Sequence, residues 1–183
     1  MTTALAIVAH PDDETLWMSG TILRNKDWRW TIFSLCRRTD KNRYPKFLKV
    51  CKFYNATPII SNLNDSSPKK LDINKITNKI SRNLKQKHFD YIFTHNKNGE
   101  YGHQRHKEVH QAVKQMIDNK QLSCNSLNFF AYYNEKFNKE LVLSDLEFKN
   151  KKNIMSEFYG FSQEAPETNE YCVNKETFME IKQ

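Results

Sequence analysis

Hydrophobic positions along the chain alternate between short continuous runs and stripes with helical spacing. Continuous runs of branched and aromatic residues are typical of strands buried on both faces. Apolar residues three or four positions apart are typical of helices with one buried face. The pattern therefore predicts strands at 3–9, 30–36, 57–61, 89–94 and 127–133, and helices at 13–26, 45–55, 73–84 and 103–117.

The remaining segments connect or follow these elements. A turn-rich loop is predicted at 62–72 and a second loop at 95–102. The C-terminal part has a weaker pattern, from which we expect a strand at 141–148 and helices at 152–161 and 175–181. The aromatic residues Trp17, Phe129, Phe130, Tyr132 and Tyr133 are expected in the core.

Strands that alternate with helices predict a parallel sheet covered on both faces. The expected fold is α/β, a Rossmann-like three-layer sandwich with a mostly parallel central sheet. The 183 residues contain no internal repeat or low-complexity linker, so residues 1–183 are expected to form a single domain. In such sheets ligands bind beyond the carboxyl ends of the strands, where the strand order reverses. In the common order 3-2-1-4-5, the ends of strands 3–9 and 89–94 are neighbours.

A compact polar motif follows the first strand. His10-Pro11-Asp12-Asp13-Glu14 replaces the apolar run without a transition. Proline cannot donate a hydrogen bond to a neighbouring strand, so the strand is expected to end here. Carboxylates are also favourable at the start of a helix, which is the simpler explanation of the three acids.

A second polar cluster lies in GEYGHQRH, residues 99–106. His103, His106 and His110 are three of the six histidines and share one face of the predicted helix. A chance run on an exposed helix is the alternative explanation. We expect His110 to be a helix-face residue and His95 to end strand 89–94 rather than line a pocket.

Together, the two clusters fit a metal site. Two imidazoles and one carboxylate, with the fourth position open to water, are typical of catalytic zinc. His10 and Asp13 form a local pair of ligands, and a histidine in the first turn of the helix after strand 89–94 can supply the third. Asp12 remains beside the metal as a proton acceptor, and His103 remains as a further imidazole. This set of residues suits hydrolysis of an unreactive carbonyl such as an amide.

The two motifs resemble those of the PIG-L/LmbE-like family of zinc-dependent N-deacetylases, which act on N-acetylglucosaminyl conjugates. AHPDDE and GEYGHQRH carry most of the resemblance, and FDYIFTHNKNGEYGH and KNIMSEFYGFSQ extend it. The resemblance implies a zinc ion bound by His10, Asp13 and His106. It implies Asp12 as the general base and His103 as the group that stabilises the oxyanion or assists proton transfer. Glu14 resembles a residue that caps the helix or supports the ligands from behind.

The chain also departs from the family pattern. Gln104 and Arg105 stand between the two histidines, where many members have proline and aspartate. The segment after the second strand, CRRTD, lacks the glycine that is common in the family. We expect Arg37, Arg38 and Arg43 to bind a phosphate or carboxylate of the substrate, the alternative being exposed loop arginines.

Charge and composition narrow the choice of partners. There are 29 basic and 21 acidic residues, a net charge of +8, which indicates either a lysine-rich solvated surface or an anionic partner. The lysines form no recognisable nucleic-acid motif, so no nucleic-acid partner is expected. The cysteines are scattered, and the sequence shows neither an apolar run of membrane length nor a secretory signal. These features predict a soluble, cytoplasmic protein. The cysteines are Cys36, Cys51, Cys124 and Cys172.

The sequence therefore predicts a zinc-dependent hydrolase that removes an N-acetyl group from an N-acetylglucosamine-type conjugate. Acetate and a free amino sugar would be the products. The same ligands also accept other divalent metals, such as Fe²⁺. Two alternatives remain open: an amidase for a non-sugar acyl substrate, and a non-catalytic, metal-dependent sugar-binding protein.

Overall fold

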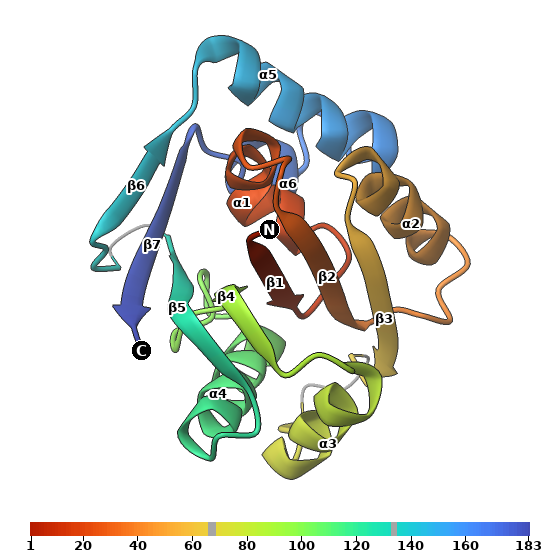
Figure 1. Cartoon of the computed structure of the whole chain (residues 1–183). Helices are drawn as coiled ribbons and strands as arrows, with labels where there is room; N and C mark the ends of the chain where they lie inside the picture. The colour runs from red at the N-terminus through yellow and green to blue at the C-terminus, as the bar shows by residue number, and fades with distance from the viewer. Residues whose placement is uncertain (66–68, 133–134) are drawn as a thin grey trace.

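The computed structural model describes residues 1–65, 69–132 and 135–183. A seven-stranded sheet in the order β3-β2-β1-β4-β5-β7-β6 forms its centre (Figure 1). The first five strands are parallel, and β7 and β6 extend the sheet in antiparallel pairing. The predicted α/β class and the order of the parallel strands are confirmed. The strands are β1 (Thr3–Val8), β2 (Arg29–Cys36), β3 (Thr57–Leu63), β4 (His88–Thr94), β5 (Ser123–Ala131), β6 (Lys139–Val142) and β7 (Lys175–Lys182).

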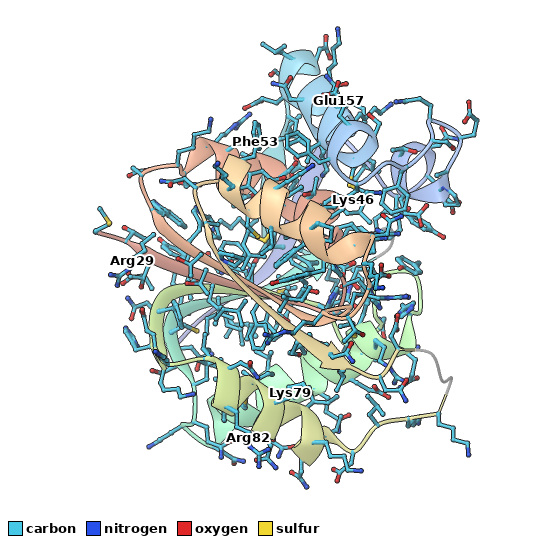
Figure 2. All side chains as sticks on the ribbon, turned by 90° about the vertical axis from the view of Figure 1, so that its right-hand side faces the viewer. Arg29, Lys46, Phe53, Lys79, Arg82 and Glu157 are labelled. Atoms are coloured by element: carbon cyan, nitrogen blue, oxygen red, sulfur yellow. The ribbon has the colours of Figure 1, made fainter. Side chains whose placement is uncertain are left out.

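Helices cover both faces of the sheet, and each layer has its own hydrophobic cluster. Figure 2 shows the two layers: Lys46 and Phe53 mark the side of α2, and Lys79 and Arg82 mark the side of α3. One face carries α1 (Asp13–Arg24), α2 (Arg43–Phe53), α5 (Asp145–Asn153) and the π-helical turn η1 (Ile154–Phe158), and the other carries α3 (Ile73–Asn83) and α4 (Gln104–Asp118). A short helix, α6 (Pro166–Asn169), lies beside η1.

Several expectations about individual residues can be compared with the structure. Trp17, Phe129 and Phe130 are buried as predicted, whereas Tyr132 is only half-buried. Tyr133 lies outside the described residues. The four cysteines are free thiols and buried. Among the described residues, no helix is both long enough and apolar enough to cross a bilayer.

Two C-terminal predictions are wrong. Residues 175–181, predicted as a helix, belong to β7, where Glu176 and Phe178 are both buried and so follow the two-residue period of a strand. Residues 141–148, predicted as a strand, contain only the end of β6. Ser144 and Glu147 form a reciprocal capping box, which starts α5 at Asp145.

Helix α1 is bent and depends on the last strand. Met18 has a non-helical backbone (φ −152°), which interrupts the helix. Glu176 of β7 accepts hydrogen bonds from the backbone N–H groups of Gly20 and Thr21, both at 2.8 Å. The Lys151 ammonium lies 3.2 Å from the same carboxylate, and both side chains are buried. Glu176 therefore caps the second half of α1 from a distant part of the chain.

We expect Glu176→Gln to lower the free energy of unfolding by about 3–5 kcal/mol, because Lys151 would stay buried without a counter-charge. Glu147→Gln is the matched control. Glu147 pairs with Arg24 at the surface, and exposed pairs contribute about 1 kcal/mol or less. Urea denaturation of both variants measures the difference, and equal losses would contradict a capping role for Glu176.

Candidate active site

The pairing of β1 with β4 brings the two polar motifs together. Ile7 and Thr94 are partners in this parallel pair, so the chain leaves both strands at the same edge of the sheet. As a result, His10 Nδ1 lies 3.3 Å from His106 Nε2, although the two residues are 96 positions apart. The strand order predicted that the two polar segments share one crevice, and the family resemblance singled out His106 as the partner of His10.

Three donor groups converge at this edge. Besides the two imidazole nitrogens, Asp13 contributes its carboxylate: Oδ2 lies 3.4 Å from His10 Nδ1, and Oδ1 lies 3.5 Å from His106 Nε2. Ligands about 2.0–2.1 Å from a tetrahedral zinc ion stand roughly 3.3–3.4 Å from one another. The spacing and the chemistry of His10, Asp13 and His106 thus fit a zinc ion.

A carboxylate binds the outward-facing ring nitrogen of each of the two imidazoles. His10 Nε2 lies 3.0 Å from Asp65 Oδ1, and His106 Nδ1 lies 2.6 Å from Glu100 Oε2. An ionised carboxylate only accepts hydrogen bonds, so each of these ring nitrogens is the donor. In a neutral imidazole the other nitrogen then keeps its lone pair, which a metal ligand requires.

His95 is near enough to be considered as a ligand but has other partners. It forms a possible metal-holding group with Asp13 and His106. However, His95 Nε2 accepts the backbone N–H of Ala9 at 3.0 Å, so its lone pair is used. Its Nδ1 donates to Glu100 Oε2 at 2.9 Å. His95 therefore follows β4 directly, as predicted, and supports Glu100 from the interior.

Asp12 is placed beside the donor groups in an unusual backbone conformation. Its φ of 122° is rare for a residue other than glycine and costs free energy. The Glu14 carboxylate accepts the Asp12 N–H at 3.1 Å, and Tyr159 Oη donates to Glu14 at 2.6 Å. Arg43 forms an ion pair with the Asp12 carboxylate. Glu14 thus lies behind Asp12 and connects its backbone to Tyr159.

His103 is the N-cap of α4. Its Nδ1 accepts the backbone N–H of Arg105 at 3.3 Å, so Nε2 carries the proton in the neutral ring. The ring centroid lies 4.8 Å from that of His10 and 4.6 Å from that of His106. The Nε2–H of His103 is therefore not needed to cap the helix, and among the described residues it has no carboxylate acceptor. His110, by contrast, bonds the carbonyl oxygen of His95 at 2.9 Å and lies on the helix face.

His10, Asp12, Asp13 and His103 line a cavity of about 210 Å³, and His106 lies behind this wall and is not among its lining residues. Arg37 and Arg43 line it, but Arg38 is exposed and is not among the lining residues. A larger, more apolar cavity of about 370 Å³ shares Leu16 with it but contains none of the predicted site residues. The smaller cavity is lined by His10, Pro11, Asp12, Asp13, Leu16, Arg37, Arg43, Asp65, Tyr101, His103 and Glu167.

Titratable groups in the cluster have strongly shifted pKa values. Burial and the carboxylate of Asp13 raise the pKa of Asp12 to about 8. Burial and the neighbouring His95 lower the pKa of His106 to about 4. Burial opposes the charge of Glu100, but His95 and His106 outweigh burial and lower its pKa to about 2. Shifts of this size in one cluster are typical of functional sites.

A tight loop between β4 and α4 places Glu100 beneath the imidazoles. Asn96 Oδ1 accepts the N–H groups of Asn98 and Glu100 at 2.7 and 3.3 Å. Gly99 has a φ of +69°, and a Cβ there would collide with the carbonyl oxygen of His103. The segment NKNGE therefore folds back on itself and turns Glu100 inward.

Sequence reasoning missed three supporting residues. Asp65 lies in a segment that was predicted only as a turn-rich loop, although it follows the carboxyl end of β3. Glu100 stands inside the second motif, where the glycines on either side indicate a special backbone. Tyr159 belongs to KNIMSEFYGFSQ, which contributed to the resemblance without a specific role.

The chain is 25% identical over 154 residues to an uncharacterised protein of Acanthamoeba polyphaga mimivirus. The match covers 76% of this chain and 66% of that protein. The chain therefore spans slightly less than two thirds of the length of this relative.

Three solved structures share the fold. An N,N'-diacetylchitobiose deacetylase from Pyrococcus horikoshii has a TM-score of 0.78 at 16% identity, with 99% of this chain and 84% of that chain covered. A deacetylase triple mutant from the teicoplanin biosynthetic pathway has a TM-score of 0.69 at 11% identity, with 100% and 99% covered. A 4-carboxy-2-hydroxymuconate hydratase from Pseudomonas putida has a TM-score of 0.66 at 11% identity, with 100% and 97% covered. The fold alone thus accommodates more than one reaction.

The family model described as PIG-L, GlcNAc-PI de-N-acetylase, matches residues 5–117. This range is more than half of the chain and includes His10, Asp12, Asp13, His103 and His106. The chain belongs to the PIG-L (GlcNAc-PI de-N-acetylase) family.

Proposed function

We propose that this protein is a zinc-dependent N-deacetylase that removes the acetyl group from an N-acetylglucosamine-type conjugate. Acetate and a free amino sugar are the products. The observation that carries the proposal is the convergence of His10, Asp13 and His106 within 3.3–3.5 Å, with Asp12 left over beside them. Several of the solved structures that share the fold are deacetylases, which supports an acetamide as the bond that is cleaved.

In this proposal Asp12 is the general base. His10, Asp13 and His106 would hold a zinc ion, which would supply polarisation of the acetyl carbonyl and acidification of water. In its ionised form, which the ion pair with Arg43 favours, Asp12 accepts the proton of the water molecule that attacks the acetyl carbonyl, and later passes a proton to the leaving amine. Arg43 pairs with Asp12 and lies 4.4 Å above the Phe161 ring, so it fixes the orientation of the carboxylate.

His103 stabilises the oxyanion. With Nδ1 bound to the Arg105 N–H, its Nε2–H is the available donor on the wall of the cavity. A preoriented donor at the developing negative charge contributes about 3–4 kcal/mol to transition-state stabilisation. The hydrogen bond from the Arg105 N–H to Nδ1 holds the imidazole ring of His103 in place.

The position of Asp12 argues against a non-catalytic sugar-binding protein. A left-handed backbone at a residue other than glycine costs about 1–3 kcal/mol. Glu14, Tyr159 and Arg43 hold Asp12 in that conformation. A protein that only bound a sugar through the metal would have no use for this arrangement. An amidase for a non-sugar substrate would need it equally, and a substrate panel separates that alternative.

We expect Asp12→Asn to lower the rate of acetate release by about 10²–10⁴-fold, because the general base is lost. Zinc content should stay stoichiometric, since Asp12 is not a ligand in this proposal. Acetate release from a panel of N-acetylglucosaminyl and non-sugar acetamides measures the first quantity, and metal analysis measures the second. Asp90→Asn, at the opposite edge of the sheet, is the control. Undiminished turnover in the Asp12 variant would exclude Asp12 as the base.

His106→Ala should lose most of its bound zinc, because one of three ligands is removed and the carboxylate of Glu100 loses its partner. His88→Ala is the matched control, since His88 begins β4 and is exposed. Metal analysis after dialysis against a weak chelator measures zinc content. Full zinc occupancy in His106→Ala would require a different third ligand.

The arginines of the cavity already have acidic partners. Arg37 Nη2 lies 2.6 Å from Asp65 Oδ2, and Arg43 pairs with Asp12. These ion pairs favour a role in orienting carboxylates over the anion clamp that the sequence suggested. We therefore propose that the conjugate is uncharged where it meets these two arginines.

Arg37→Gln should accordingly raise KM by the same factor for neutral and anionic N-acetylglucosaminyl conjugates, because the effect acts through Asp65. Arg38→Gln, which alters an exposed arginine of the same loop, is the control. Steady-state kinetics with both classes of substrate measure KM. A selective increase for anionic conjugates in the Arg37 variant would restore the anion clamp.

A further inference from the structure

We propose that Asp65 and Glu100 are positioning residues that fix opposite ring nitrogens of the two imidazole ligands. Asp65 makes His10 present Nδ1, and Glu100 makes His106 present Nε2, to the same ion. This inference rests on the proposed metal site but is separable from the deacetylase activity. It gives a task to two acids that the reaction itself does not use.

The two imidazoles must expose different atoms. His10 leaves the end of β1, and His106 lies in the first turn of α4, so their rings approach the centre from different sides. The atoms that meet are Nδ1 of His10 and Nε2 of His106, at 3.3 Å. Because the two tautomers of a free imidazole are both populated, each ring needs a partner that selects the required one.

Asp65 selects the tautomer of His10. Its Oδ1 accepts Nε2–H at 3.0 Å, while its Oδ2 binds Arg37 at 2.6 Å. Each carboxylate oxygen thus has one donor, which fixes the plane of the carboxylate relative to the ring. Arg37 is half-exposed, whereas Asp65 is largely enclosed. The series of contacts from Arg37 through Asp65 to His10 therefore runs from the rim of the cavity inward.

Glu100 selects the tautomer of His106, and both of its carboxylate oxygens accept hydrogen bonds. Its Oε2 accepts Nδ1–H groups from His106 at 2.6 Å and from His95 at 2.9 Å. Its Oε1 accepts the N–H of Asn96 at 2.9 Å. The side chain is completely buried. Three donors on two oxygens require a carboxylate, because a carboxamide would direct its own N–H₂ group at one of them.

The test is zinc affinity in Glu100→Gln and Asp65→Asn, measured by competition with a chromogenic chelator. In Glu100→Gln, the surplus donor favours the wrong tautomer of His106, with a proton on Nε2. In Asp65→Asn, the charge that holds Nε2–H of His10 is lost. We expect zinc to bind about 10–100-fold more weakly in each variant. An unchanged dissociation constant in both would overturn the proposal.

Two controls separate positioning from stability. Glu108→Gln alters a buried carboxylate of α4. Among the described contacts, Glu108 binds Arg105 and the Leu71 N–H but no imidazole. Asp40→Asn alters an acid that also contacts Arg37 but not His10. Both should keep wild-type zinc affinity, even where thermal denaturation shows a loss of stability. Weaker zinc binding in all four variants in proportion to lost stability would show a merely structural role and overturn the proposal.

A measurement on the wild-type protein guards against variants that fail to fold. In zinc-loaded, ¹⁵N-labelled protein, histidine-ring NMR spectra should assign the metal to Nδ1 of His10 and Nε2 of His106. Metal on either of the other two ring nitrogens, or no zinc binding at all, would overturn the inference. Zinc bound through these nitrogens without acetate release from any acetamide would leave the positioning inference intact and refute only the proposed function.

Discussion

The parallel pairing of β1 with β4 is the interaction on which the site depends. These strands are far apart in the sequence, and their hydrogen bonds place Ala9 and His95 at the same edge. From there, one short loop carries His10 to Asp13, and a longer loop leads to His103 and His106. A shift of the strand register by one residue would exchange the faces of every side chain in β4 and separate the donors. The buried apolar runs of both strands prevent such a shift, since each residue of β1 from Ala4 to Val8 is inaccessible to solvent.

Around this junction, a network of buried polar groups holds Asp12 in place. Glu14 accepts from Tyr159, Thr15 and the Asp12 backbone, and Thr15 in turn contacts Tyr54. Each of these groups is enclosed, and each has a partner, so the network stabilises one arrangement instead of several. Through Tyr159 and Tyr54, this network connects the ends of η1 and α2 with the start of α1 at the Glu14 carboxylate. The strained backbone at Asp12 persists because the surrounding structure determines it from several directions.

The sequence predicted the parts of the molecule that follow from local pattern and strand order. The buried runs identified the five parallel strands, and the rule for the carboxyl ends of such strands predicted that His10 and the segment 95–106 share one crevice. The family resemblance then selected His106 within that segment. Local pattern failed where a distant partner decides the conformation. Residues 175–181 resemble a helix by spacing, but pairing with β5 and the burial of Glu176 against Lys151 make them a strand. The tasks of Asp65 and Glu100 could not be predicted, because they depend on which nitrogen of a ring faces inward, and spacing in the sequence carries no information about that.

The contact between Glu176 and α1 also constrains the order of events during synthesis. The N–H groups of Gly20 and Thr21 leave the ribosome before their acceptor, which is more than 150 positions later in the chain. Until that acceptor emerges, the second half of α1 lacks its cap, and the helix that begins at the metal-binding motif stays incomplete. Completion of α1 is thereby coupled to the synthesis of β7, because the two backbone N–H groups find their acceptor only when β7 has joined the sheet.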